Sequence, residues 1–306
     1  MSRHPRGVAL ISALLVVALA STAAARLMSS QYLNLRHSGN LFMRDQAWHY
    51  LDGAEAFAMV LIDKAVRNGR LYELLGQEST FPVEGGVLTG RIDDLQGRFN
   101  LNGLVDDQGK IASLPQERLQ KLLNDLGIDA GLADAIIDWL DGDATPVSQA
   151  GAEDDFYLNQ TPAYRAANTR MESLSELMLI RGYRKLPEEK RKHLEPLLTT
   201  LPDATAINVN SAADELLRAI GFKSEGIQAI RNRLDKGGAG PIQSLDELKS
   251  LKLLPDEKLE GLTTTTEYFL LTATAQIGRA RLKQYSIIHR SPKGALQVVA
   301  RSLGTP

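Results

Sequence analysis

The sequence predicts an α+β protein in which a long N-terminal helix packs on an antiparallel sheet and a large all-α domain interrupts that sheet. Three observations lead to this prediction. An uncharged apolar run opens the chain and passes into a helical pattern, strand-like segments occur at 87–102 and 267–302, and helical patterns fill the interval between them. Strands on both flanks of one helical block indicate a single sheet with an insertion.

The N-terminal apolar run has no charge from Val8 to Ala25 and is bracketed by Arg6 and Arg26. These eighteen residues would span about 27 Å as a helix, just short of the ~30 Å hydrocarbon core of a bilayer. The residues alone leave two interpretations open. Small residues at 23–25 favour a cleaved secretory signal, whereas a helix that continues past Arg26 favours a signal anchor with a cytoplasmic N-terminus. Either way, most of the chain leaves the cytoplasm.

The composition excludes several classes of protein. The 306 residues include 35 Lys and Arg against 37 Asp and Glu, and this near balance gives no sign of a polyanionic partner. There is no cysteine, which excludes disulfides and thiolate-bound metals. The five histidines are scattered, and the sequence has no nucleophile elbow, P-loop or His-Glu-x-x-His motif. We therefore expect neither an enzyme nor a nucleic-acid partner.

A long helix is predicted from Arg26 to about Arg67, with Asn68-Gly69 as its end and Gly39-Asn40 as a weak point. Its apolar residues recur every three or four positions and form one face, which consists of Ala47, Leu51, Ala54, Ala58 and Leu61. Glu55 lies beside this stripe and is interpreted as part of a solvated helix face.

Strand-like segments flank the helical block on both sides. Residues 87–102 are predicted as two short strands with a turn at Asp94 or Gly97. The last forty residues are predicted as three strands, which are Glu267–Arg279, Leu282–His289 and Ala295–Ser302.

The helical block contains a diverged internal repeat. Phe99-Asn-Leu-Asn102 matches Ile207-Asn-Val-Asn210, and residues 122–141 match residues 216–235 at a constant offset of 94. Ser173-Leu-Ser-Glu-Leu177 likewise matches Ser244-Leu-Asp-Glu-Leu248. Each unit is predicted as an Asn-anchored turn, two helices joined at Gly127 or Gly221, and a third helix that begins with a capping box.

The second unit resembles a helix-hairpin-helix module of membrane-tethered DNA-uptake proteins, which bind phosphates through a Gly-hydrophobic-Gly turn. The turn here, Ile220-Gly-Phe-Lys-Ser-Glu-Gly226, lacks the second glycine at its place, and unit one has Asp129 where a phosphate would approach. A structural hairpin is therefore the main interpretation. A membrane-anchored DNA-binding protein is the alternative, and its positive charge would come from Lys223, Arg231, Arg233 and Lys236.

Unit one contains a long acidic loop where unit two has a short link. Its five carboxylates belong to Asp141, Asp143, Glu153, Asp154 and Asp155, and Asn168 follows. Closely spaced carboxylates repel one another unless a cation compensates them, and flexible oxygen ligands suit Ca²⁺. The loop is not an EF-hand, because Pro146 and Ala152 stand where that motif needs Gly and Glu. A solvated acidic loop is the alternative interpretation.

Motifs along nearly the whole chain make it resemble the K-type minor pseudopilins of type II (general) secretion systems. These motifs are Arg6-Gly7 before the apolar run, Asp45-Gln-Ala47, Gly53-Ala-Glu55, Phe99-Asn-Leu-Asn102, Asp138-Trp-Leu-Asp-Gly-Asp143, Gly151-Ala-Glu-Asp154, Tyr164-Arg165, Asn168 and Ser175-Glu-Leu177. The resemblance implies a pseudopilin fold, a long N-terminal helix on an antiparallel sheet, with a large α-helical insertion. It divides the chain into a leader (1–7), a transmembrane segment (8–25), the helix with the first strands (26–102), the inserted domain (103–262) and the C-terminal strands (263–306).

The resemblance also implies how the N-terminus is processed. A prepilin peptidase is expected to cut after Gly7 and to methylate the new N-terminus at Val8. The apolar run then stays as a single-pass inner-membrane anchor, with the bulk of the chain in the periplasm. The implied role is to sit at the pseudopilus tip with the I- and J-type minor pseudopilins, to initiate the filament, and to support export of folded proteins across the outer membrane. An H-type partner is left open.

The resemblance finally points to Ca²⁺ in the acidic part of the inserted domain. Its best ligand candidates are Asp141, Asp143, Glu153 and Asp154, followed by Asp155 and Asn168.

Ser12 is the fifth residue of the predicted mature chain, where most pseudopilins carry a glutamate. A carboxylate at that position pairs with the N-terminal amine of a neighbouring subunit, because an unpaired charge in hydrocarbon is costly. With Ser12 the chain offers no carboxylate to a subunit above it, yet the amine of Val8 can still receive one from below. This asymmetry is typical of a subunit with nothing above it.

Overall fold

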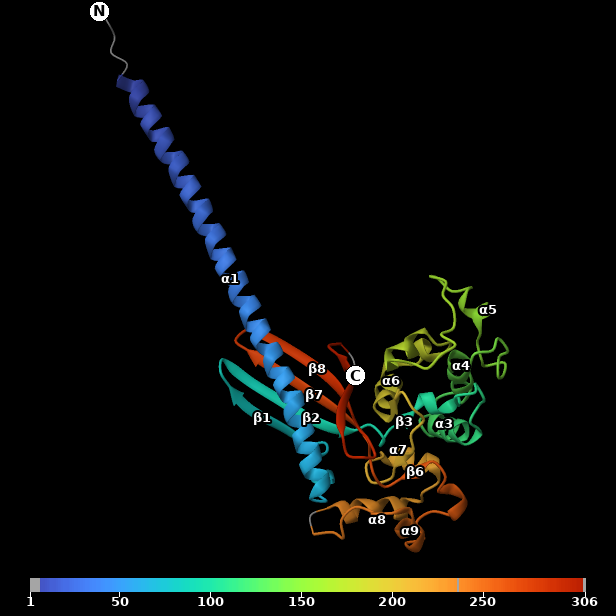
Figure 1. Ribbon diagram of the computed structural model, residues 1–306. Helices are drawn as coiled ribbons and strands as arrows, with labels where there is room; N and C mark the ends of the chain where they lie inside the picture. The colour runs from blue at the N-terminus through green and yellow to red at the C-terminus, as the bar shows by residue number, and fades with distance from the viewer. Residues whose placement is uncertain (1–5, 236, 305–306) are drawn as a thin grey trace, which may run out of the picture.

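The computed structural model describes residues 6–235 and 237–304. Most of the predicted leader, residues 1–5, lies outside the described residues, as do Lys236 and the last two residues. The chain forms one long helix, one five-stranded sheet and a mainly helical domain inserted between two strands of that sheet (Figure 1).

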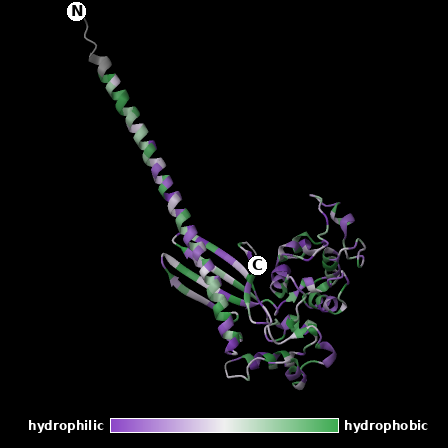
Figure 2. Cartoon of the chain, in the orientation of Figure 1, coloured by the Kyte–Doolittle hydropathy of each residue, from purple (hydrophilic) through white to green (hydrophobic). Residues whose placement is uncertain are grey.

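Helix α1 is continuous from Arg6 to Arg67, so its 62 residues extend about 93 Å. Its first turn contains Gly7 and Val8, and it continues through the weak point at Gly39-Asn40. Within the described chain it is the one helix long and apolar enough to cross a membrane. The N-terminal half projects away from the rest of the molecule and is the most hydrophobic stretch of the helix (Figure 2). The predicted end before Asn68-Gly69 is confirmed.

The sheet combines strands from both ends of the sequence, as predicted. Its order is β1-β2-β7-β8-β9, with every neighbouring pair antiparallel. The strands are β1 (Glu78–Val83), β2 (Gly86–Asp94), β7 (Tyr268–Ile277), β8 (Ala280–Arg290) and β9 (Leu296–Ser302). Pairing of β2 with β7 sets Ile92 opposite Leu271 and closes the sheet across the insertion. The three C-terminal strands match their predicted positions closely.

Strand β1 was not predicted, because its sequence carries no alternation of buried and exposed side chains. Every residue from Glu78 to Pro82 is exposed. Its backbone pairing with β2 places it in the sheet, and Pro82, which has no N–H, is tolerated because β1 lies at the sheet edge.

One face of α1 packs on the sheet and forms the core of this part of the molecule. Ala47, Leu51, Ala54 and Ala58 are buried as predicted, but Ile62 and not Leu61 completes the stripe. Alternate side chains of β7 face the helix, because successive residues of a strand point to opposite sides. They are Phe269, Leu271, Ala273, Ala275 and Ile277.

The interpretation of Glu55 as part of a solvated face is wrong. Its side chain is 5% exposed and points at the sheet, where it accepts hydrogen bonds from Arg301 and Ser286. Burial by itself raises the pKa of Glu55, but the hydrogen bonds from Arg301 and Ser286 outweigh it and hold this pKa below its usual value. Glu55 therefore ties α1 to β8 and to the last strand, β9.

The inserted domain is mainly helical, but the prediction that it is all-α is wrong. It contains two two-stranded parallel sheets, β3 with β4 and β5 with β6, and each pairs the start of one unit with the end of the same unit. Each strand has only two residues, too few to give a period in the sequence. These strands are Phe99–Asn100, Leu198–Thr199, Ile207–Asn208 and Leu262–Thr263.

The α-helices that follow α1 are α2 (Leu71–Leu74), α3 (Ser113–Asp125), α4 (Gly131–Leu140), α5 (Asp154–Tyr157), α6 (Glu188–Leu194), α7 (Asp214–Ile220), α8 (Ser224–Leu234) and α9 (Leu245–Ser250). Short 3₁₀ segments are η1 (Leu101–Leu104), η2 (Leu174–Leu179), η3 (Tyr183–Lys185), η4 (Glu195–Leu197) and η5 (Asp256–Lys258). One continuous apolar core runs through both halves of the inserted domain.

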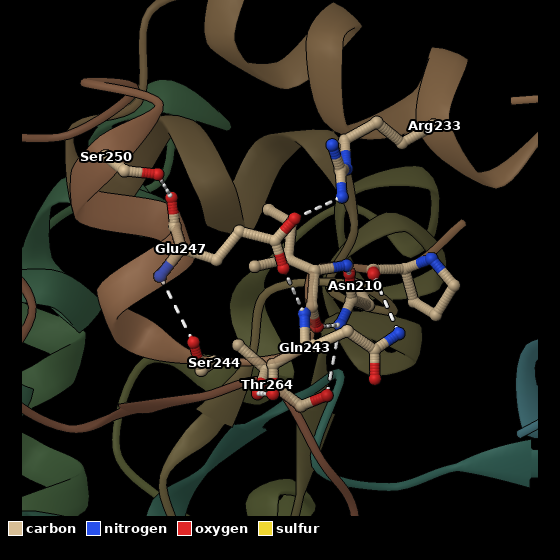
Figure 3. A network of polar contacts seen from close by, with 9 residues as sticks. Asn210, Arg233, Gln243, Ser244, Glu247, Ser250 and Thr264 are labelled. Carbon is tan, nitrogen blue, oxygen red and sulfur yellow. Dashed lines mark hydrogen bonds and ion pairs between the residues drawn. The ribbon is translucent and has the colours of Figure 1, made fainter. Parts of the chain in front are cut away.

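The two Asn-anchored turns make parallel sets of hydrogen bonds. Asn102 donates its side-chain amide to the carbonyls of Met171 and Leu201 and accepts from the amide of Met171. Asn210 donates to the carbonyls of Ile242 and Thr264 and accepts from the amide of Ile242 (Figure 3). Each asparagine thus fastens the segment before the third helix of its unit to the segment that closes that unit.

The third helices of the two units begin in a similar way. Ser173 forms the complete predicted capping box with Glu176. Ser244 accepts from the amide of Glu247, whereas the Glu247 carboxylate takes the amide of Gln243, one residue earlier than in the predicted box (Figure 3).

Buried Asp94 links the sheet to the second unit. Its carboxylate accepts from the side chains of Asn208, Ser211 and Thr266 and from the amide of Gln96. Burial raises the pKa of Asp94. Since these partners come from the end of β2, from β5 and from the return to β7, the carboxylate fixes the point where the inserted domain leaves and rejoins the sheet.

Candidate metal centre

The acidic loop begins where α4 ends and leads to α5, on the side of the inserted domain remote from the sheet (Figure 1). Helix α4 is almost wholly buried, so the position of Asp141, which caps its C-terminal end, is fixed by the core. From there the chain bends back, and Glu153 precedes the first turn of α5.

The structure brings three of the predicted ligands together. Asp141, Asp143 and Glu153 each contribute a carboxylate oxygen, and these oxygens lie within 4.8 Å of one another. Asp141 and Glu153 are buried, whereas Asp143 is exposed and also accepts from the amide of Thr145. The cluster therefore has two oxygens held by the core and one on the loop surface.

Several buried oxygens here have no hydrogen-bond partner in the described chain. They are Oδ1 of Asp141, Oε1 of Glu153 and Oδ2 of Asp138. Buried polar atoms are nearly always paired, and an unpaired carboxylate oxygen costs more than a neutral one. These oxygens match the ligands that a hard cation such as Ca²⁺ prefers.

The electrostatics of the loop agree with this. Burial, followed by repulsion from Asp143 and Asp138, raises the pKa of Asp141 to about 6. Burial, followed by repulsion from Asp138 and Asp141, raises the pKa of Glu153 to about 7. Both carboxyls are thus harder to ionise than ordinary carboxyls, and a bound cation would offset that cost.

Asp138 was not among the predicted ligands, although it lies one helical turn before Asp141. It is fully buried, and its Oδ1 accepts from the amide of Val147. Burial raises the pKa of Asp138. The signal in the sequence is the i, i+3 spacing of Asp138 and Asp141, which places both carboxylates on one side of the end of α4.

The remaining predicted ligands lie outside the three-carboxylate cluster. Asp154 accepts from the amide of Ala166, and its Oδ2 lies 3.7 Å from Nε of Arg165. Asp155 is exposed in the first turn of α5. Asn168 has a left-handed backbone conformation, with φ 47°, and its backbone N–H donates to the carbonyl of Trp139. Asp154 and Asn168 thus hold the loop in place beside the cluster.

A cluster of aromatic rings and one arginine packs beneath the loop. Trp139, Tyr157 and Tyr164 pack together, with ring centroids of 5.3 Å for the first two. Arg181 donates to the carbonyl of Gly151 and lies over the ring of Phe156. At Gly151 there is no room for a side chain, because an added Cβ would be 2.0 Å from Oδ2 of Asp138.

The two arginines proposed for DNA binding are engaged within the chain. Arg231 donates to the carboxylate of Asp214 and to the carbonyl of Ala212. Arg233 is paired with Glu247 and half buried (Figure 3). A phosphate backbone would have to displace these carboxylates, which counts against the DNA-binding alternative.

Comparison with solved structures shows which class of protein has this fold. The chain superposes on a chain of the GspK–GspI–GspJ complex of the enterotoxigenic Escherichia coli type 2 secretion system with a TM-score of 0.73 and 23% sequence identity. The match covers 86% of this chain and 97% of the other. The long N-terminal helix on an antiparallel sheet with a helical insertion is thus a fold that this chain shares with a component of a type 2 secretion system complex.

Sequence comparisons identify the family. A family model described as "Type II secretion system (T2SS), protein K" matches residues 97–203. Type II secretion system protein K of Pseudomonas aeruginosa is 36% identical over 321 residues, covering 99% of this chain and 94% of that protein. The Aeromonas hydrophila protein of the same name is 30% identical, with 99% and 98% covered. The chain belongs to the type II secretion system protein K family, whose members are structural pseudopilin components and not enzymes.

Proposed function

We propose that this chain is a minor pseudopilin of the pseudopilus tip, where it assembles with I- and J-type minor pseudopilins, initiates the filament and supports export of folded proteins across the outer membrane. The observation that carries the proposal is the fold that this chain shares with one chain of the solved GspK–GspI–GspJ complex, over 97% of the length of that other chain. The inserted domain adds bulk at the end of the molecule remote from the anchor, which suits a subunit with no neighbour above it (Figure 1).

The membrane arrangement follows from α1. The prepilin peptidase would remove residues 1–7 and methylate Val8, leaving the uncharged segment 8–25 as the single-pass inner-membrane anchor. Arg3 and Arg6 on the short side favour a cytoplasmic N-terminus and a periplasmic sheet and inserted domain. Mass spectrometry of the protein extracted from membranes tests this directly. We expect an N-terminal peptide that begins at methylated Val8, and a peptide that begins at Ala25 or Arg26 would contradict the proposal.

The acidic loop is proposed to bind Ca²⁺ through Asp141, Asp143 and Glu153, with Asp138 as a further oxygen donor or support. The unpartnered buried oxygens and the raised pKa values of this cluster support the site. When bound, the ion would supply the positive charge that lets the buried carboxylates ionise together. Its role is structural, since it would hold the long loop against α4 and α5.

The inserted domain is further proposed to contain two diverged copies of one helix-hairpin-helix-like unit. The parallel hydrogen bonds of Asn102 and Asn210 support this proposal. A second pair of contacts also supports it. In the third helix of each unit a glutamate accepts a hydrogen bond, Glu176 from Trp139 and Glu247 from Arg233. The two donors lie 94 residues apart, which is the offset of the repeat.

Co-purification tests the proposed assembly. The full chain, carrying an affinity tag, would be co-expressed with the I- and J-type minor pseudopilins of the same bacterium and extracted from membranes in mild detergent. We expect both to be recovered with the chain, and an H-type subunit in a parallel expression would settle whether it joins them. Recovery of neither the I- nor the J-type subunit would overturn the proposal.

A further inference from the structure

A pocket of about 360 Å³ lies in the inserted domain, at the junction of its two repeat units. Its walls come from β3, η1 and α3 of the first unit and from the segments that lead into β5 and β6 of the second. Most of the side chains that line it are apolar, and they include Phe99, Val105, Leu114, Pro115 and Ile207. Pockets for small ligands typically have volumes of about 300 to 1,000 Å³, so this pocket is large enough to take one.

Arg118 of α3 is the one buried charged residue among those that line the pocket, and it is only 5% exposed. Its Nη2 donates to the carbonyls of Lys258 and Glu260, at 3.0 and 2.7 Å, and these two bonds fix the guanidinium. Its Nη1 lies against Gly261, where an added Cβ would be 2.9 Å away. Within the described chain Nη1 and Nε make no hydrogen bond, so the pocket contains a fixed cationic donor with N–H groups to spare.

This guanidinium has no carboxylate partner among the described residues. Glu117, one position earlier on α3, is paired with Lys121, and the Glu260 side chain is exposed. Burial lowers the pKa of Arg118, although the charges of Glu260 and Glu117 act in the opposite direction. A buried charge without a counter-ion is costly. A carboxylate that entered the pocket would supply the missing negative charge.

The charges at the rim define the ligand further. Asp106 and Glu260 line the outer part of the pocket, and both are exposed. Asp106 already accepts from the amides of Gln108 and Lys110. Two carboxylates at the rim disfavour a doubly charged anion such as phosphate, but they match a ligand with one carboxylate at its inner end and a positive charge further out.

One wall of the pocket is an irregular backbone segment, residues 204–206, that leads into β5. The side chain of Asn100 holds this segment by donating to the carbonyl of Asp203 and to the hydroxyl of Thr205. Neither the N–H nor the carbonyl of Ala204 and Thr205 makes a hydrogen bond within the described chain. Unpaired N–H and carbonyl groups on a fixed segment are what the backbone of another polypeptide pairs with, so this wall favours a peptide over a small organic acid.

We propose that this pocket binds the C-terminal residue of another polypeptide. Its apolar side chain would lie among Phe99, Leu114 and Ile207, and its terminal carboxylate would accept from Nη1 of Arg118. A basic residue further back in the same peptide would lie near the carboxylates at the rim. Peptide binding of this kind is an activity separate from the proposed place of the chain in the pseudopilus tip.

Fluorescence anisotropy tests the proposal on the full chain in mild detergent. The probe is the peptide Gly-Lys-Ala-Leu with fluorescein at its N-terminus and a free terminal carboxylate, and the matched probe is the same peptide with a C-terminal amide. We expect the acid to bind at least about tenfold more tightly than the amide, because only the acid compensates the charge of Arg118. No measurable binding of the acid, or equal affinities for the two peptides, would overturn the proposal.

Competition with an unlabelled small acid separates a peptide from a small molecule as the ligand. N-acetyl-leucine has the same apolar side chain and carboxylate but lacks the preceding backbone and the lysine. It should displace the probe at least about tenfold less effectively than unlabelled Gly-Lys-Ala-Leu does. Equal competition would overturn the assignment of a polypeptide.

Arg118→Met should abolish the preference for the acid over the amide, whereas Arg279→Met, at an exposed arginine of the sheet, should keep it. Because Arg118→Met also removes two internal hydrogen bonds, its thermal unfolding is measured alongside. A folded Arg118→Met variant that still prefers the acid would contradict the role of this guanidinium.

Gly103→Leu tests the pocket with Arg118 in place, and its result decides if Arg118→Met does not fold. Gly103 lines the pocket, and an added Cβ there meets nothing within 4 Å, so the larger side chain fills the pocket without straining the fold. Binding of both peptides should weaken by at least about tenfold while the melting temperature stays unchanged. The matched control is Gly39→Leu on α1, where a Cβ also meets nothing, and it should bind as the wild type does. Undiminished binding by Gly103→Leu would overturn the proposal.

Discussion

Calcium binding to the acidic loop should release protons, and the number released should depend on pH in a way that the structure fixes. The metal-free pKa values are about 6 for Asp141 and about 7 for Glu153. At pH 6.5 these two carboxyls together carry about one proton, and at pH 8 about a tenth of a proton. A bound cation requires both to be ionised, so binding at pH 6.5 should expel about one proton and binding at pH 8 almost none.

Isothermal titration calorimetry measures this number directly. The full chain in detergent would be titrated with CaCl₂ in two buffers of different ionisation enthalpy at each pH, since the slope of observed enthalpy against buffer enthalpy is the proton count. Glu153→Gln should remove most of the release at pH 6.5, whereas Asp155→Asn, at an exposed position outside the cluster, should leave it unchanged. Equal slopes at the two pH values, with binding intact, would refute the assignment of the buried carboxyls as ligands.

The same shifts set the sign of the pH effect on stability. A carboxyl whose folded pKa is raised holds more protons in the folded than in the unfolded state between the two pKa values, so the free energy of unfolding falls as pH rises through that window. For Asp141 and Glu153 the window runs from about 4 to about 7. The metal-free chain should therefore lose stability in this window, and calcium should restore it at neutral pH.

Three further predictions follow from the fold. Adding Ca²⁺ at about a hundredfold excess over its Kd should stabilise the folded chain by about 2.7 kcal/mol, a rise of roughly 5 to 10 °C in Tm that chelator reverses, and an unchanged Tm would contradict the site. Glu55→Ala should cost about 2 to 4 kcal/mol in denaturant unfolding, because it leaves Ser286 and Arg301 without their buried acceptor, whereas Asp63→Ala, in an exposed pair with Arg67, should cost less than about 1 kcal/mol. Ser12→Glu should leave the unfolding of the sheet and inserted domain unchanged but make the chain more frequent within filaments, as counted by immunogold labelling; wild-type protein found throughout filaments would sink the argument from Ser12.

The parts of the fold that could be predicted are those in which apolar residues recur at a regular spacing in the sequence. The stripe from Ala47 to Ala58 and the alternation in β7 each repeat often enough to be read from the sequence, and both lie in the core. Strand β1 and the two-residue parallel strands could not be predicted, because backbone pairing with distant segments creates them. Glu55 was misjudged for a related reason: its partners, Ser286 and Arg301, are more than two hundred residues away, and only the closed sheet brings them to it.

At the candidate site, the composition of the loop does not show which carboxylates come together. Composition points to all five carboxylates between Asp141 and Asp155 equally, yet the loop's return path sends Asp154 to the amide of Ala166 and leaves Asp155 in solvent. Asp138 lies in the buried helix α4, and because Gly151 has no side chain, the loop backbone can lie against the unpartnered oxygen of Asp138. The number of acidic residues alone thus does not define a cation site in such a loop. What defines the site is which of those carboxylates the helix α4 and the return of the chain to α5 keep buried. That is why a substitution at exposed Asp155 and one at buried Glu153 should behave so differently, although the sequence presents them as near equals.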